Sequence, residues 1–412
     1  MPNFEGVAIP MKQIPNLPVK VLIGGELGDI NCQPLQPYSA EAINFFAELS
    51  KNLLANPAIR IYSDIAGFAY WCRRANLLRL SRSFDIRDRR IGRGIVLHIS
   101  PSNVPVNFAF SLAFGLLSGN SNIVRLSESS HAQVDVICEE ISKLLKLSNH
   151  SRIAGMVRII RYPRNNEITA SLSESCHARV LWGGDATINN LRSMKTSPRC
   201  VDICFADRYS LCVMNANAIL ASNEKVLNEL VSGFYNDVFL LDQNACSSPH
   251  LVLWQGDEAQ VAVAMSRFWN AMEFFLLTKA PQPAIHVLDK YMHLCRTAIL
   301  IEPDILFSRH QNLIYRLRLE KLPADIDRYR GRCGFFFEAI DNNFDILGTI
   351  ISERYQTITY FGLDPEVILN LITKSGLTGV DRVVPVGKAL DIGVIWDGYD
   401  LIGTLSRVIS LQ

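Results

Sequence analysis

The chain has 412 residues, and its 41 basic and 40 acidic side chains leave a net charge of +1. This length exceeds what one hydrophobic core usually serves and predicts two or three domains. The balanced charge argues against nucleic acid or an anionic membrane as a partner. The N-terminus lacks the charged-then-apolar order of a signal peptide, and the longest apolar run, Val104 to Leu117, is too short to span a bilayer. We therefore expect a cytoplasmic protein without a membrane span.

The first ninety residues predict a strand, a turn and two helices. Residues 19–23 are strand-like and lead into Gly24 and Gly25, which we interpret as a turn because no helix follows. A helix is expected from Ser39, a good N-cap, and a second over residues 63–80.

From residue 91 to about 215, strand-like and helix-like stretches alternate. Apolar runs typical of strands occupy residues 94–99, 122–126, 156–161, 179–182 and 210–214. This alternation predicts a parallel sheet covered on both faces, with a nucleotide cofactor at the carboxyl ends of its strands. The clearest helix is predicted to start at Ser130, whose spacing to Gln133 suggests a capping box. No G-x-G-x-x-G or Walker motif is present, so any phosphate site must be built differently.

The second half predicts another α/β unit. Helices are expected over 222–241, 257–277, 285–299, 344–351 and 365–373, strands over 250–254, 334–338 and 356–361, and a basic segment over 309–332. The predicted organisation is a helical segment and cofactor domain over residues 1–215, a catalytic domain over 216–375, and a segment over 376–412 that returns to the sheet or forms an oligomer interface.

Cys246 is the strongest candidate for chemistry. It lies between a predicted helix and a predicted strand, among small and polar residues that would let a thiol reach a substrate. The alternative is an inert buried cysteine, which is the usual state of a free cysteine. The ten cysteines form no short-spaced framework and no C-x-x-C pair, so they are expected to be reduced and to bind no metal.

A second stretch raises Cys246 above that alternative. At residues 98–105, H-I-S-P-S-N-V-P, a predicted strand ends in an asparagine between two prolines. The Asn103 amide would then lie at the carboxyl end of the strand, where it can donate a hydrogen bond to a developing oxyanion.

Two further motifs accompany residues 98–105, namely G-N-S-N-I-V-R-L-S-E at 119–128 and Q-N-A-C at 243–246. In their order and spacing, the three motifs resemble those of the aldehyde dehydrogenase superfamily. Within it, the sequence resembles the LuxC type of fatty acyl-CoA and acyl-protein thioester reductase. The resemblance rests on residues 98–106, 116–122, 207–210 (D-R-Y-S), 242–249 (D-Q-N-A-C-S-S-P), 381–392 and 396–399 (W-D-G-Y). It implies an α/β aldehyde-dehydrogenase-like fold, with a Rossmann-like parallel-sheet cofactor domain and an α/β catalytic domain.

The resemblance also implies roles for particular residues. Cys246 would be the nucleophile, and Asn103 and the backbone N–H of Cys246 would hold the oxyanion. The adenosine ribose or its phosphate would contact Arg125, Ser127 and Glu128, and the cofactor turn would contain Gly183 and Gly184. Phe205 occupies the position where oxidising members keep a glutamate that activates water. Without that base an acyl-enzyme would persist until it is reduced.

The implied function is reduction of an acyl thioester, acyl-CoA or acyl-protein and fatty acyl in character, to the aldehyde through an S-acyl cysteine. NADPH is the favoured reductant because Arg125 could pair with its 2′-phosphate. Glu128 would repel that phosphate, so NADH is kept as an alternative reductant. The family's habits further imply an acyl carrier, an acyl-protein synthetase partner and a homo-oligomer. Two alternatives are a CoA-acylating aldehyde dehydrogenase running oxidatively and a non-catalytic scaffold for an acyl-activating partner.

Overall fold

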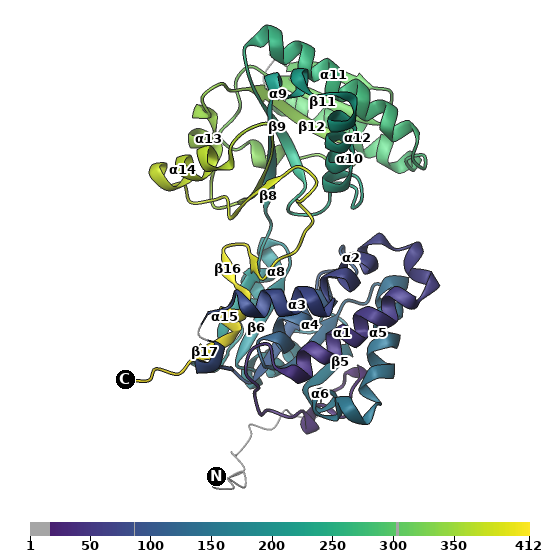
Figure 1. The fold of residues 1–412 in the computed structure, drawn as a ribbon, viewed down its shortest axis with the longest axis vertical. Helices are drawn as coiled ribbons and strands as arrows, with labels where there is room; N and C mark the ends of the chain where they lie inside the picture. Colours follow the sequence, from purple (N-terminus) through teal and green to yellow (C-terminus); the bar gives the residue numbers. More distant parts are fainter. Residues whose placement is uncertain (1–16, 86, 302–304) are drawn as a thin grey trace. The chain divides into compact units, whose positions relative to one another are not determined.

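The computed structural model describes residues 17–85, 87–301 and 305–412 and divides into two compact units. The first unit contains the described residues up to Ala206 together with Tyr399–Gln412, and the second contains Asp207–Gly398. Each unit is a sheet flanked by helices (Figure 1). No helix within the described ranges is long and apolar enough to cross a membrane.

The sheet of the first unit has six strands. They are β1 (Lys20–Ile23), β3 (Ile95–Ile99), β4 (Ser121–Leu126), β5 (Val157–Arg161), β6 (Ala178–Trp182) and β7 (Val201–Phe205), in the spatial order β1-β5-β4-β3-β6-β7. All neighbours are parallel except β1, which runs antiparallel to β5. The central strand β3 is buried along its whole length, as expected for a parallel strand covered on both faces.

The α-helices of the first unit include the one predicted to start after Ser39. They are α1 (Ala40–Ala55), α2 (Ser63–Trp71), α3 (Arg74–Arg82), α4 (Asn107–Leu117), α5 (Ala132–Leu145), α6 (Ser151–Met156), α7 (Asn166–Ser175), α8 (Asp185–Arg192) and α15 (Leu401–Leu405). The Ser39 side chain caps α1 by accepting from the Ala42 amide.

Two helix predictions in this unit were wrong. The single helix expected over 63–80 is two helices, because α2 ends before Cys72 and a new N-terminus forms at Arg73. The expected capping box at Ser130 does not form, since α5 starts at Ala132 with His131 at the N-cap and no side-chain bond there.

The C-terminal residues complete the first unit. Strand β17 (Ser406–Val408) pairs antiparallel with β2 (Arg90–Gly92). The buried Asn120 side chain donates to the Leu405 carbonyl at 2.9 Å and accepts from the amides of Arg93 and Gly94. The Asn120 side-chain amide therefore connects Leu405, near the C-terminus, to the residues that precede β3.

The sheet of the second unit has seven strands. They are β8 (Tyr209–Asn215), β9 (Pro249–Gln255), β10 (Ile305–His310), β11 (Ile314–Leu319), β12 (Phe335–Ile340), β13 (Tyr355–Phe361) and β14 (Arg382–Pro385), in the order β10-β11-β12-β9-β8-β13-β14. Only β10 runs antiparallel to its neighbour. The predicted first domain, residues 1–215, included β8, but this strand lies inside the second sheet.

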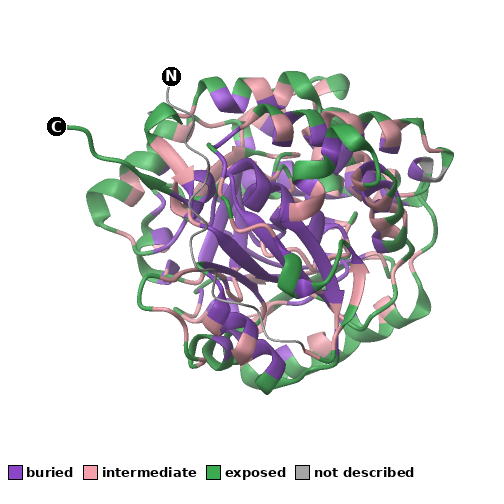
Figure 2. Cartoon of the chain, turned by 90° about the horizontal axis from the view of Figure 1, so that it is seen from below, coloured by how far each residue is buried: buried purple, intermediate pink, exposed green. Residues whose placement is uncertain are grey.

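Two hydrophobic clusters cover the faces of this sheet. Leu211 and Val213 of β8 face one cluster and Cys212 and Met214 the other, as the period of two in a strand requires. The helices are α9 (Ala216–Ala221), α10 (Glu224–Val238), α11 (Glu258–Leu277), α12 (Ala284–Leu300), α13 (Asp345–Ile350) and α14 (Pro365–Ser375). The central strands are buried, and the outer helix faces are exposed (Figure 2).

Candidate active site

Cys246 lies at the amino edge of the second sheet. It follows α10 by eight residues and precedes β9 by three. Ser210 and Gln356 are the second residues of the parallel strands β8 and β13, so their side chains start at the same edge. The Ser210 hydroxyl donates to the Cys246 carbonyl at 2.7 Å and accepts from the Thr357 amide at 3.1 Å. This hydroxyl therefore ties the backbone of Cys246 to β13.

Gln243 fixes the turn that presents the thiol. Its side chain is buried, accepts from the amides of Gly334 and Phe335, and donates to the carbonyls of Pro249 and Phe335. Asp242 and Gln243 both have positive φ, 50° and 62°, which is costly for residues other than glycine. The four hydrogen bonds of the Gln243 amide offset that cost, which explains why a glutamine three residues before the cysteine suits this turn.

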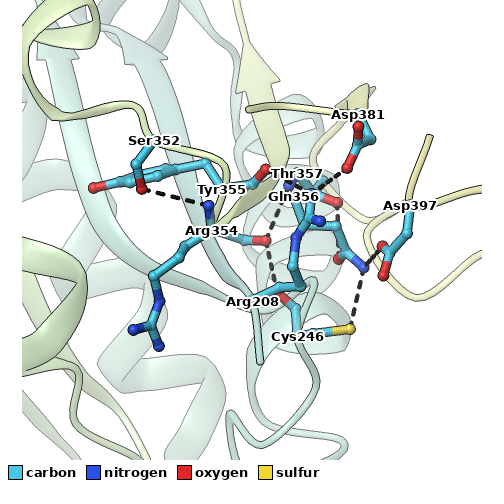
Figure 3. Close-up of polar contacts among 10 residues, drawn as sticks. Arg208, Cys246, Ser352, Arg354, Tyr355, Gln356, Thr357, Asp381 and Asp397 are labelled. Atoms are coloured by element: carbon cyan, nitrogen blue, oxygen red, sulfur yellow. Dashed lines mark hydrogen bonds and ion pairs between the residues drawn. The ribbon is translucent and has the colours of Figure 1, made fainter. Parts of the chain in front are cut away.

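The thiol has a polar partner from the far end of the second unit. The Gln356 Nε2 group donates to Cys246 Sγ at 3.2 Å and also to a carboxylate oxygen of Asp397 (Figure 3). Gln356 Oε1 accepts from the Thr357 hydroxyl at 3.3 Å, which directs the NH2 group toward the sulfur and the carboxylate. Gln356 is fully buried, Asp397 is 7% exposed and Cys246 is half-buried.

Two arginines place positive charge beside this group. Arg208 forms an ion pair with Asp381 and donates to the Tyr355 carbonyl at 2.9 Å (Figure 3). Arg382, at the start of β14, lies 4.2 Å from the centre of the Trp396 ring, and burial lowers its pKa. Both guanidinium groups interact electrostatically with the Cys246 thiol.

Cys246 is a neutral thiol at pH 7 in this structure. Burial and the negative charge of Asp397 raise its pKa to about 12, against the opposing effects of the Gln356 hydrogen bond, Arg208 and the residue's own amide. Burial also raises the pKa of Asp397 to about 6, although Arg208, Gln356 and Arg382 act in the opposite direction. The thiol therefore has to lose its proton during the reaction to act as a nucleophile.

Sequence reasoning selected Cys246 but missed the residues that surround its sulfur. Arg208, Asp381 and Asp397 lie inside the D-R-Y-S, D-R-V-V-P and W-D-G-Y stretches, where they carried the family resemblance without a role. Gln356 belongs to none of these stretches. A buried polar residue at the start of an apolar strand is the one signal that could have identified it.

The remaining predicted site residues lie in the first unit. Asn103 is exposed in the turn between β3 and α4. Arg125, near the end of β4, donates to the Tyr162 carbonyl at 3.2 Å. Ser127 is half-buried and Glu128 exposed in the loop after β4. Gly183 donates its amide to the Phe205 carbonyl, and Gly184 is the N-cap of α8. These residues all lie at or after the carboxyl ends of strands.

The same edge of the first unit contains a small pocket and two buried polar atoms that lack a partner among the described residues. A small pocket opens between β3, β4 and the start of α5, lined by Ser100, Pro101, Pro105, Phe108, Leu126, Ser127, Ser129, His131, Val134 and Arg161. Buried polar atoms of Ser100 and Arg161 have no partner among the described residues. The N-cap of α8 is Gly184, which has no side chain to cap the helix.

Other polar candidates are structural. The buried His98 accepts from the Ser111 hydroxyl through Nδ1 at 2.7 Å and donates to Asn122 Oδ1 through Nε2 at 2.9 Å, and burial lowers its pKa to about 4. Glu338 is buried and accepts from the indoles of Trp254 and Trp269 and from Arg316. Each group is satisfied within its own core.

Phe205 ends β7 with an aromatic stack. Its ring lies 3.7 Å from the Trp182 ring, centre to centre, with 22° between the planes, and meets the edge of Tyr399. An aromatic side chain packed in this way cannot take a proton from water.

Both sheets and their topology define an aldehyde-dehydrogenase-like fold. The aldehyde dehydrogenase KauB from Pseudomonas aeruginosa superposes with a TM-score of 0.62 at 11% identity, over 91% of this chain and 84% of that one. A putative aldehyde dehydrogenase from Burkholderia cenocepacia gives a TM-score of 0.59 at 14% identity, with the same coverage.

Sequence similarity narrows this class to one family. Residues 74–408 match the model of the acyl-CoA reductase (LuxC) family, so the chain belongs to that family. A long-chain acyl-protein thioester reductase from Photorhabdus luminescens is 22% identical over 78% of this chain and 64% of its own length. One of the same name from Vibrio harveyi is 27% identical over 41% of this chain and 34% of its own length. The aligned regions thus span from a third to just under two thirds of these relatives.

Proposed function

We propose that this protein reduces an acyl thioester, an acyl-CoA or an acyl-protein with a fatty acyl chain, to the aldehyde through an S-acyl intermediate on Cys246. The observation that carries the proposal is the Cys246 thiol at a sheet edge, hydrogen-bonded by Gln356 and flanked by two arginines. The family and the printed names of the relatives support the same reaction.

Cys246 attacks the thioester carbonyl and displaces the carrier thiol, which leaves the acyl group on sulfur. The Cys246 amide and the Asn103 side chain are the proposed donors to the oxyanion in this step. The first unit would hold the nicotinamide cofactor at Arg125, Ser127, Glu128, Gly183 and Gly184, and the bound cofactor supplies the hydride. The resulting thiohemiacetal releases the aldehyde and returns the thiol.

Reduction is favoured over the oxidative alternative by Phe205. Its stack with Trp182 leaves no carboxylate at the position where the superfamily activates water, so the acyl-enzyme would wait for reduction. NADPH is the proposed reductant because Arg125 and Arg164 interact electrostatically beside the carboxyl end of β4, where a 2′-phosphate could be neutralised. An acyl-activating synthetase as acyl donor and a homo-oligomeric assembly complete the proposal.

Steady-state turnover tests this proposal. Purified protein is mixed with fatty acyl-CoAs and either NADPH or NADH, and both cofactor oxidation and aldehyde formation are measured. We expect aldehyde in equal amount to the cofactor consumed, with NADPH preferred, and no turnover in Cys246→Ala. Aldehyde formed by Cys246→Ala at the wild-type rate would refute the proposal. No aldehyde from the wild type, together with an effect on a partner synthetase that is equal in wild type and Cys246→Ala, would favour the scaffold alternative.

A further inference from the structure

The proposed function leaves one question at the site: which group takes the proton of a thiol whose pKa is raised to about 12. Four groups act on this thiol within the described part of the second unit, namely Gln356, Arg208, Arg382 and Asp397. An amide and two guanidinium groups cannot accept a proton at neutral pH. Asp397 is the member of this set that can.

The geometry places the Asp397 carboxylate within reach of the sulfur. Gln356 Nε2 is bonded to both Cys246 Sγ, at 3.2 Å, and a carboxylate oxygen of Asp397. Two acceptors on one nitrogen are at most about 6 Å apart, since each hydrogen bond spans about 3 Å. Figure 3 shows the three side chains converging from the turn before β9, from β13 and from the loop before Gly398. The gap is one that a side-chain rotation or one water can close.

The backbone holds Asp397 at this position. Asp397 and Gly398 have φ of 47° and 73°, the pair of left-handed residues typical of a two-residue turn with the sequence Asp-Gly. The carboxylate is 7% exposed. The charged groups that face it are Arg208, Asp381 and Arg382, together with the Cys246 thiol. The W-D-G-Y stretch thus brings one ionisable acid into the site from the end of the second unit.

We propose that Asp397 is the general base that accepts the Cys246 proton as the thiol attacks the thioester, and that it returns this proton to the departing carrier thiolate. This inference rests on the proposed role of Cys246. The S–H bond breaks, its proton passes to a carboxylate oxygen, and the sulfur forms the new S–C bond. The bond between carbon and carrier sulfur then breaks, and the carrier sulfur takes the electron pair and the proton from Asp397. No oxidation occurs in this step.

Asp397→Asn gives a sharp test because it removes the base and keeps the shape and the turn, since asparagine tolerates positive φ. Two rates are measured at Cys246 by peptide mass spectrometry without cofactor: alkylation by iodoacetamide and single-turnover acylation by an acyl-CoA. The alkylation rate reports the fraction of Cys246 that is thiolate, and the negative charge of Asp397 lowers that fraction. We therefore expect the alkylation rate at pH 8 to rise in Asp397→Asn. Acylation needs the base, and we expect it to fall about 100-fold or more.

The pH profile of acylation gives a second readout that a structural role would not change. With Asp397 as the base, the wild-type rate rises through pH about 6 and then levels, following the ionisation of Asp397. In Asp397→Asn the rate should instead climb tenfold per pH unit up to pH 9, as expected for a thiol that must ionise unaided. Asp391→Asn is the matched control, because Asp391 is an exposed aspartate in the segment after β14 and pairs with Lys388.

The outcomes separate the two proposals. An acyl adduct that persists in Cys246→Ala would refute the proposed nucleophile itself. If the adduct is confined to Cys246, the acylation rate of Asp397→Asn tests the role of Asp397 alone. An acylation rate that rises together with the alkylation rate, or that equals the rate of Asp391→Asn, would overturn that role. Peptide-level resolution is needed because the chain has other free cysteines, among them the exposed Cys295, which is accessible to iodoacetamide.

Discussion

The neutral state of the Cys246 thiol is the residue-scale feature with the widest consequence. Burial and Asp397 raise its pKa to about 12, so the resting site protects the sulfur from oxidation and alkylation. Reactivity then depends on groups that act during attack. Arg208, Gln356 and Asp397 could not be assigned from the sequence, because 38 positions or more separate each from Cys246 along the chain. Only the folded chain brings them to one edge of the second sheet, Gln356 on β13, Arg208 just before β8 and Asp397 in the turn before Gly398.

Asn103→Ala tests the proposed oxyanion donor. Loss of one such donor typically lowers the rate about 100- to 1000-fold, and we expect that range for single-turnover acylation. Because Asn103 is exposed, the urea midpoint should stay within experimental error of the wild type. The neighbouring exposed residue provides the control variant, Ser102→Ala, which should acylate normally. Equal acylation rates in both variants would rule out Asn103 as a donor.

At the scale of elements, most strands of the two sheets could be predicted from the sequence, and some could not. Runs of buried apolar residues identified β3, β4, β5, β6 and β8, because both faces of these strands are covered. The edge strands β7 and β10 and the inner strand β11 were missed. Strands β7 and β10 are only partly buried, and β11 lies inside the Arg-rich segment 309–332, where arginines interrupt its apolar run.

The turn before Cys246 depends on Gln243, which supplies a test at this scale. Gln243→Ala leaves the buried amides of Gly334 and Phe335 without an acceptor, and each such group costs about 1–3 kcal/mol. We expect the free energy of unfolding to fall by about 2–4 kcal/mol and the acylation rate to fall with it. Urea denaturation measures the first effect. Asn244→Ala is the control, since that half-buried side chain only bonds two nearby carbonyls. Unchanged stability in Gln243→Ala would contradict the assigned role.

At the scale of the whole molecule, buried ionisable groups give the fold a defined pH dependence. Burial lowers the pKa of His98 to about 4, below the 6.5 of an unfolded histidine. The stabilisation from keeping it neutral is complete above pH 6.5 and is lost as pH falls toward 4. Asp237 acts in the opposite direction: burial raises its pKa to about 7, so its contribution is largest below pH 4 and is lost as pH rises through 7.

His98→Gln isolates the first of these effects. The wild type should lose about 3 kcal/mol through His98 between pH 6.5 and 4, and the variant should lack this part of the slope. Guanidinium denaturation at a series of pH values measures it. The half-buried His131, at the N-cap of α5, gives the control variant His131→Gln, which should keep the wild-type slope. Identical slopes in wild type and His98→Gln would show that His98 is not held neutral.

The sequence predicted two α/β units, but the boundary between them depended on strand β8, which the sequence could not assign to a sheet. Strand β8 is as apolar as the strands of the first sheet, which precede it in the chain. It pairs, however, with β9 and β13, which come later in the chain. Sheet membership is set by these distant partners. The apolar pattern within residues 209–215 does not indicate which strands these partners are.

Intact-protein mass spectrometry tests the central claim most directly. The protein is mixed with a series of fatty acyl-CoAs, its mass is measured, and NADPH is then added. We predict a mass increase equal to one acyl group, located on Cys246 by peptide mapping, absent in Cys246→Ala, and discharged as aldehyde by NADPH. An adduct on another residue, or an adduct that reduced cofactor leaves in place, would contradict the account.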